Sequence, residues 1–151
     1  MMNRLLQQRQ HRALFILLFA LFLVFACNSQ PRYAAPAKIG ADVAVDETSL
    51  QFEIPRFFTY RYDGKNISFF VIRMKSGIQS YLDACTNCYP HKMGYHFANG
   101  AVECRFCGQN FSVSKLQKGL GGCYPIAIGG RVEKGQYLIS VEILEKAANK
   151  F

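Results

Sequence analysis

Two C-x-x-C motifs constrain this chain more than any other feature. One runs from Cys85 to Cys88 and the other from Cys104 to Cys107, with fifteen residues between them. Each motif turns the chain so that its two sulfurs point the same way, and two such turns together make a four-thiolate set. Such a set suits zinc or an iron–sulfur cluster. The fold must therefore bring two loops side by side.

A further cysteine, Cys123, lies on a third loop, in the stretch Gly-Leu-Gly-Gly-Cys-Tyr-Pro. Gly121 and Gly122 precede it directly. Glycine has no Cβ, so these residues would let the backbone of this loop approach another part of the molecule closely.

Other cysteine chemistries fit less well. Covalent haem attachment needs C-x-x-C-H, but the residues that follow the two motifs are Tyr89 and Gly108. A thioredoxin-like site would need a helix within a βαβ unit, which the pattern does not contain. Exported cysteines usually oxidise, yet five thiols leave one unpaired, and bridges within C-x-x-C close small strained loops. Metal or cluster binding is favoured, and structural disulfides or a thiol redox role remain alternatives.

The first 27 residues have the form of a targeting segment. Three arginines precede 14 unbroken apolar residues, 13–26, and Cys27 follows directly. This length suits a signal sequence and is short of the roughly 20 residues of a spanning helix. Cys27 stands where bacterial lipoproteins carry their lipid, so we expect lipidation there, with an uncleaved anchor or simple cleavage as alternatives. All three alternatives place the remaining residues outside the cytoplasm, on the periplasmic side. There they are attached to a membrane or lie beside one.

Charge gives little support for nucleic-acid binding. Residues 28–151 contain 15 Lys and Arg against 10 Asp and Glu, a net charge of +5. These charges are scattered and form no basic cluster interleaved with aromatic residues, so no nucleic-acid partner is expected.

The exported part reads as a linker followed by an all-β domain. Residues 28–48 are rich in Pro and Ala, whereas residues 49–146 carry strand patterns separated by turn pairs such as Asp63-Gly64 and Asn99-Gly100. Only the last residues, 144–150, have a helical composition. Strands are expected at 50–54, 56–62, 66–74, 78–82, 95–97, 101–103, 124–128 and 137–144.

The order and spacing of the cysteine loops resemble those of Rieske iron–sulfur domains, with cysteines where Rieske domains use histidines. With that change the chain resembles the FtrD-like family of membrane iron–sulfur containing proteins from about Tyr62 to Leu144. The matching positions include Asp63-Gly64-Lys65, Phe69-Phe70, Cys85, Cys88, Gly94-Tyr95, Cys104, Cys107-Gly108, Phe111, Gly121-Gly122-Cys123 and Pro125-Ile126.

The resemblance implies a Rieske-like antiparallel β-sandwich with a 2Fe–2S-type centre held by the cysteines of the two motifs, Cys85, Cys88, Cys104 and Cys107. Its potential would be lower than that of a Rieske centre, where two imidazoles raise it. Cys123 would cover the centre, replace a ligand or exchange with a thiol. The family's association with ferrous iron uptake and redox steps implies an electron carrier, rather than a stand-alone enzyme, with a redox or iron-permease partner.

The alternative is a zinc- or copper-binding structural or metal-handling module, or a disulfide-stabilised domain, without redox function. The targeting segment lacks an adjacent arginine pair, so a cluster assembled in the cytosol would not cross within a folded domain, whereas zinc loaded outside would avoid this problem. His91, Met93 and His96 in the first loop are potential copper or iron ligands, although exposed loop residues are the simpler interpretation. Asp83, near the first motif, is expected to fix the loop by accepting backbone N–H bonds.

Overall fold

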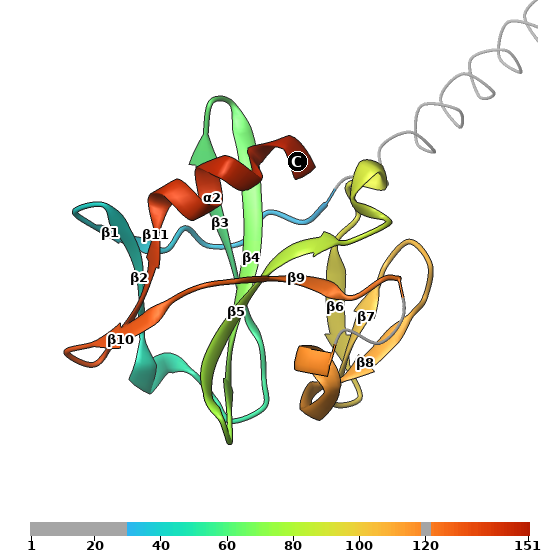
Figure 1. Ribbon diagram of the computed structural model, residues 1–151, viewed down its shortest axis with the longest axis horizontal. Coiled ribbons are helices and arrows are strands. Elements are labelled where there is room, and N and C mark those ends of the chain that lie inside the picture. Colours follow the sequence, from blue (N-terminus) through green and yellow to red (C-terminus); the bar gives the residue numbers. More distant parts are fainter. Residues whose placement is uncertain (1–29, 119–121) are drawn as a thin grey trace, which may run out of the picture.

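The structure, a computed structural model, describes residues 30–118 and 122–151. The targeting segment and Cys27 therefore lie outside the described residues. Within the described ranges, no helix is long and apolar enough to cross a membrane. The described residues form antiparallel β-sheets with one short α-helix (Figure 1), which confirms the all-β class expected from the strand patterns.

Three sheets form within this described part of the chain. The first sheet contains, in spatial order, β1 (Ala37–Ile39), β2 (Asp42–Asp46), β11 (Gln136–Ser140) and β10 (Arg131–Glu133). The central sheet contains β3 (Arg56–Tyr62), β4 (Lys65–Met74), β5 (Gly77–Cys85) and β9 (Pro125–Ile128). The third sheet contains β6 (Tyr95–Ala98), β7 (Ala101–Cys104) and β8 (Asn110–Ser112). The helical segments are η1 (Glu47–Ser49), η2 (Tyr89–His91), η3 (Val113–Lys118), α2 (Val141–Lys146) and η4 (Ala147–Lys150).

The central sheet separates two hydrophobic cores. Successive side chains of a strand point to opposite faces, and in β4 Phe69 and Val71 join one core while Phe70 and Ile72 join the other. The first core also takes residues from the first sheet and from α2, and the second core takes residues from the third sheet. Figure 1 shows the first and third sheets on opposite sides of the central sheet.

Both predicted hairpin turns are confirmed. Asp63-Gly64 joins β3 to β4, and Asn99-Gly100 joins β6 to β7, with all four residues at positive φ. Two consecutive residues of positive φ match the right-handed twist of the flanking strands, and for this reason Asn-Gly and Asp-Gly are favoured in two-residue hairpins. The second of these hairpins brings the two C-x-x-C motifs together.

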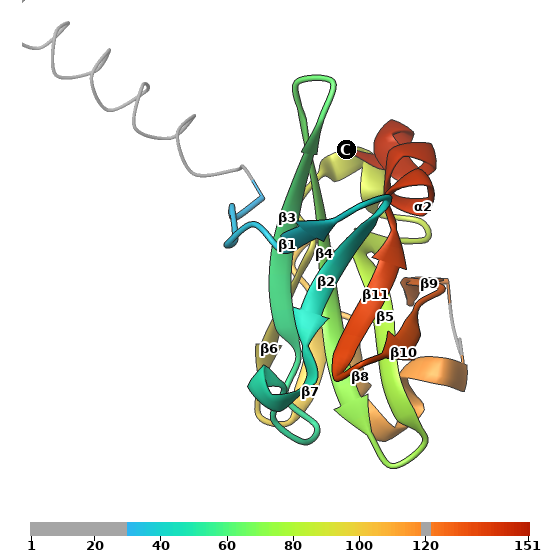
Figure 2. The same ribbon diagram turned by 90° about the vertical axis from the view of Figure 1, so that its left-hand side faces the viewer.

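The structure differs from the pattern-based expectation in several stretches. Residues 37–48, expected as part of the linker, form β1, β2 and the start of η1. Two short strands, β8 and β10, lie where the pattern predicted none. Residues 50–54 form no strand and contribute one isolated bridge, between Phe52 and Arg73. The strand expected to run to Leu144 ends at Ser140, where α2 begins (Figure 2). The apolar residues Val141, Leu144, Ala147 and Phe151 recur at helical spacing and pack into the first core, which favours the helix over the alternation.

Candidate metal centre

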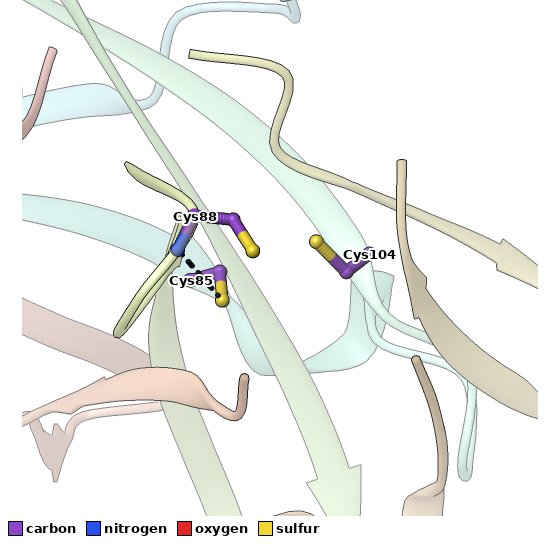
Figure 3. Close-up of side chains that lie close together, drawn as sticks. All are labelled: Cys85, Cys88 and Cys104. Carbon is purple, nitrogen blue, oxygen red and sulfur yellow. Dashed lines mark hydrogen bonds between the residues drawn. The ribbon is translucent and has the colours of Figure 1, made fainter. Parts of the chain in front are cut away.

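Three loops carry the five cysteines to one end of the central and third sheets. Cys85 is the last residue of β5, and Cys88 follows in the turn before η2. Cys104 ends β7, and Cys107 lies in the turn that follows. Cys123 precedes β9, whose Pro125 pairs with Cys85 and so brings the third loop to the first. Figure 3 shows Cys85 and Cys88 on one loop with Cys104 opposite, and the sulfurs of Cys88 and Cys104 turned toward each other.

The sulfurs form two overlapping sets of three. The inner triad consists of Cys85, Cys88 and Cys104, and the outer triad of Cys88, Cys107 and Cys123. Within each triad every pair of Sγ atoms lies within 4.8 Å. Within the outer triad, Cys88 Sγ lies 3.6 Å from Cys123 Sγ. All five cysteines in the described part of the chain are free. The structure thus brings together every cysteine that the sequence pattern singled out in the folded domain.

The two triads lie at different depths. Cys85 and Cys104 are each 2% exposed and belong to the second core. Cys88 and Cys123 are half-buried, and Cys107 is exposed. The site therefore has an enclosed side and a side that faces solvent.

Backbone N–H groups support negative charge on two of the thiols. Burial opposes ionisation of Cys85, but N–H groups of Cys88 and Asn87 outweigh it and hold the pKa of this thiol below its usual value. The N–H of Cys88 lies 3.3 Å from Cys85 Sγ. For Cys107 burial also opposes ionisation, and the N–H of Gln109 is the main group that lowers its pKa. A metal ion would need such thiolates as ligands.

The remaining thiols are harder to ionise in the absence of a cation. Burial raises the pKa of Cys104 and of Cys88, and neighbouring thiols raise that of Cys88 further. Burial also raises the pKa of Cys123 to about 11. Five crowded thiols cannot all carry negative charge without a compensating positive charge. The set therefore has the chemistry of a metal site, in which a bound cation would stabilise the thiolates.

Tyr95, at the start of β6, connects all three loops. Its backbone N–H donates to Asp83 Oδ1 (2.6 Å), and its carbonyl accepts from Arg105 Nε (2.9 Å). Its buried phenol donates to the carbonyl of Cys123 (2.8 Å). The strand pattern indicated Tyr95 as a sheet residue but not this role, because the partners lie 10 to 28 residues away in the chain.

Asp83, a buried residue of β5 just before the first motif, accepts hydrogen bonds that hold the first loop in place. Its side chain is almost fully buried, and besides Tyr95 it accepts a hydrogen bond from Gln30 Nε2 (2.8 Å). Burial raises the pKa of this carboxyl to about 6. The bond from the Tyr95 N–H confirms the expectation that Asp83 fixes the loop by accepting from the backbone.

The two loop histidines lie outside both triads. The ring of His91 stacks on Phe106, with 3.5 Å between ring centroids. His96 lies on β6, where its Nε2 is 3.7 Å from Glu103 Oε2. Met93 lines a small cavity that also contacts Cys85 and Cys88. The alternative in which these loop residues bind copper or iron thus gains no support from the positions of the two histidines.

The chain matches one known protein family. A family model described as "Membrane iron-sulfur containing protein FtrD-like" matches residues 43–151. No curated protein matches the chain. The matched region contains both triads, and cysteine thiolates are the usual ligands of iron–sulfur clusters. The residues present therefore fit the group that the family description names.

Proposed function

Because the chain belongs to the FtrD-like family of membrane iron–sulfur containing proteins, we propose that it is a membrane-tethered, extracytoplasmic electron carrier. The four cysteines of the two C-x-x-C motifs hold an iron–sulfur centre of the 2Fe–2S type. The observation that carries the proposal is the meeting of five free thiols, from three separate loops, at one end of the fold. When bound, the centre supplies one-electron oxidation and reduction.

The spread of the sulfurs favours a centre with more than one metal ion. In a tetrahedral zinc site with Zn–S bonds of about 2.3 Å, the sulfurs would lie roughly 3.8 Å apart. Here the thiols divide into two triads that share only Cys88. Five thiols also exceed the four that one tetrahedral ion uses. Two metal positions would use this set more fully than one.

The depth of the thiols suits electron transfer. Cys85 and Cys104 are buried, which would limit the access of water to one side of the centre. Cys107 is exposed beside Phe106, a large apolar side chain with 48% of its surface exposed. A partner docked at this side would come close to the centre without any movement of the fold.

The loops around the thiols favour an acidic partner surface. The segments 86–94, 105–116 and 122–124 contain no Asp or Glu, and they contain Lys92, Arg105 and Lys115. A basic surface steers and orients an acidic partner more strongly than it contributes affinity. A redox or iron-permease protein of the same membrane is the proposed partner, in ferrous iron uptake or respiration.

The proposal includes the arrangement of the chain at the membrane. Residues 1–27 act as signal peptide or anchor, with Cys27 as the lipid attachment site, and place the domain on the periplasmic side. Gln30, the first described residue, donates from Nε2 to the carbonyl of Asp83 at 2.6 Å, next to the thiol-bearing loops. Because few residues separate Cys27 from Gln30, the centre would remain near the membrane surface.

The test is metal and spectroscopic analysis of the full chain purified without oxygen from its membrane. We expect iron and acid-labile sulfide in equal amounts, visible charge-transfer absorption, and an EPR signal after reduction. Cys85→Ser should abolish the signal, whereas Cys27→Ser, in the targeting segment, should retain it in the detergent-extracted protein. Colourless protein with stoichiometric zinc would overturn the proposal.

A zinc- or copper-binding structural module is the second candidate function. The 3.6 Å separation of the Cys88 and Cys123 sulfurs favours it, because this is close to the spacing expected around one tetrahedral ion. In that case Cys85→Ser would lower the melting temperature without changing any electron transfer. The disulfide-stabilised alternative requires bonded cysteines, and mass spectrometry of the unreduced protein would detect them.

A further inference from the structure

We propose that Cys123 is a metal ligand and that the outer triad, Cys88, Cys107 and Cys123, is an exchangeable position for a soft, thiophilic metal ion. This position is distinct from the inner triad but is joined to it through Cys88. The assignment deepens the proposed function and rests on it in one respect, that the thiols of this domain bind metal. It adds that the site has five ligands and two unequal positions.

The first observation is the geometry of the outer triad. One thiol comes from each of the three loops, and all three Sγ atoms lie within 4.8 Å of one another. Cys123 approaches Cys88 to 3.6 Å between sulfurs. Three thiolates at such distances can converge on one ion with little rearrangement of their side chains, because neighbouring sulfurs in a thiolate site lie roughly 3.8 Å apart.

The second observation is that the third loop is held in this place by specific contacts. Thr86, between Cys85 and Cys88, donates from both its N–H (3.2 Å) and its Oγ1 (2.9 Å) to the carbonyl of Tyr124. The Tyr95 phenol donates to the carbonyl of Cys123 itself. These bonds hold Cys123 and Tyr124 against the first motif and Tyr95.

Gly122 lies beside the first motif. A Cβ at this position would meet the amide end of the exposed Asn87 side chain, which would have to turn aside. The bonds to the carbonyls of Cys123 and Tyr124 hold the backbone on the C-terminal side of Cys123, with its thiol 3.6 Å from Cys88 Sγ.

The third observation is the difference in exposure between the two triads. Cys107 is exposed, and Cys88 and Cys123 are half-buried, whereas the inner triad contains the two buried thiols. Three thiolates leave the fourth tetrahedral position open, which is the arrangement of sites that exchange a ligand rather than of closed structural sites. Thiolate ligands select Cu(I), zinc and iron over hard cations such as magnesium and calcium. The outer position would therefore load and release such an ion at the protein surface.

The experiment counts ions bound to metal-free full chain under anaerobic conditions. Cys27→Ser is the background, so that the thiol in the targeting segment does not contribute. Cd²⁺ alone is the probe, with binding measured by thiolate-to-cadmium absorption and by equilibrium dialysis. We expect two Cd²⁺ per chain in this background, and one after the additional change Cys123→Ser.

Two further variants control the experiment. Cys123→His replaces the thiol with another metal ligand and should restore the second ion with weaker thiolate absorption. Ser112→Ala, at an exposed serine of β8, should leave both ions in place. The restoration would show that the loss in Cys123→Ser is a loss of a ligand and not of the fold.

The outcomes separate this inference from the proposed function. If the background protein binds one Cd²⁺, and Cys123→Ser changes neither the count nor the absorption, the outer position is refuted while the four-thiolate centre stands. If the background protein binds no Cd²⁺, the proposed metal-binding function fails as well.

Discussion

The contact between Gly94 and Asp83 sets how closely the first and second cysteine loops approach. Gly94 has a φ of +65°, and a Cβ on it would lie 2.6 Å from Asp83 Oδ1. The neighbouring Tyr95 N–H donates to that same oxygen, and the Gly94 carbonyl accepts from the N–H of Arg105 at 3.0 Å. Any side chain at position 94 would therefore push against a buried carboxylate that holds two loops together.

This contact predicts unequal effects of two glycine substitutions. Gly100→Ala, in the β6–β7 turn, should cost about 1–2 kcal/mol, because its φ is also positive but no atom lies within 4 Å of the added Cβ. Gly94→Ala should cost a further 1–3 kcal/mol or so from the overlap with Asp83. Urea unfolding of metal-free protein would measure both. Equal losses in the two variants would show that the Asp83 side chain moves aside freely.

At the level of residues, local spacing was sufficient to identify the thiols of the two motifs. Their positions within C-x-x-C turns fix their direction, so Cys85 and Cys88 could be placed from the sequence alone. The contact of Cys123 with Cys88 could not be predicted from the sequence. It depends on the pairing of Cys85 with Pro125, which are 40 residues apart in the chain. The same holds for Tyr95, whose three partners come from three different segments.

Among the elements, β4 has the largest influence on both cores. Phe69 and Phe70 are adjacent, both fully buried, and point to opposite faces. Phe69 stacks with Phe58 in the first core, with 5.6 Å between ring centroids. Phe70 contacts Tyr81 (5.2 Å) and, edge-on, Tyr95 (6.5 Å), which carries the hydrogen bonds between the cysteine loops.

The opposite faces of β4 predict that two neighbouring substitutions separate stability from metal binding. Phe69→Ala and Phe70→Ala should each lower the free energy of unfolding by about 3–5 kcal/mol, since each removes a buried ring. Only Phe70→Ala removes packing behind Tyr95, and it should weaken Cd²⁺ binding about tenfold, equivalent to about 1.4 kcal/mol.

Unfolding would be measured in urea and Cd²⁺ binding by absorption. Both measurements would be made below the melting temperature of the less stable variant. Phe52→Ala is the control, because this side chain is half exposed and should change neither quantity much. Equal weakening of binding in the Phe69 and Phe70 variants would contradict the separation of the two cores.

The elements differ in how well their sequence patterns indicated them. The strand predicted at 66–74 is confirmed as β4, and its residues 67–72 are buried on both faces of the sheet. Strand β2 was not predicted, because its short run Val43-Ala44-Val45 lies among small residues and Pro that resemble a linker. Its strand conformation depends on pairing with β11, nearly 100 residues away. At α2, local alternation suggested a strand, but burial of one helical face against the first core decided the outcome.

In the molecule as a whole, the metal centre would act as a cross-link between distant segments. Its thiols come from the ends of β5 and β7 and from the loop before β9, which belong to two different sheets. The third sheet is a small three-stranded unit packed on the central sheet through the second core. Opening of this sheet alone would separate Cys104 and Cys107 from the other thiols and release a bound ion.

Removal of metal is therefore predicted to uncouple the third sheet from the rest. In metal-free protein, amides of β6 and β7 should exchange with deuterium faster than those of β4 and β5, because the small sheet can open without global unfolding. Metal at 100 times its dissociation constant should slow the β6 and β7 amides about 100-fold, equivalent to about 2.7 kcal/mol, because the opened form has lost its ligand set. Hydrogen exchange followed by NMR or mass spectrometry would measure this, with the Cys85→Ser and Cys104→Ser double variant as the control that should respond only weakly to metal. Equal protection of the two sheets in the metal-free protein would mean that the second core alone couples them, and that the thiols contribute nothing to the cohesion of the fold.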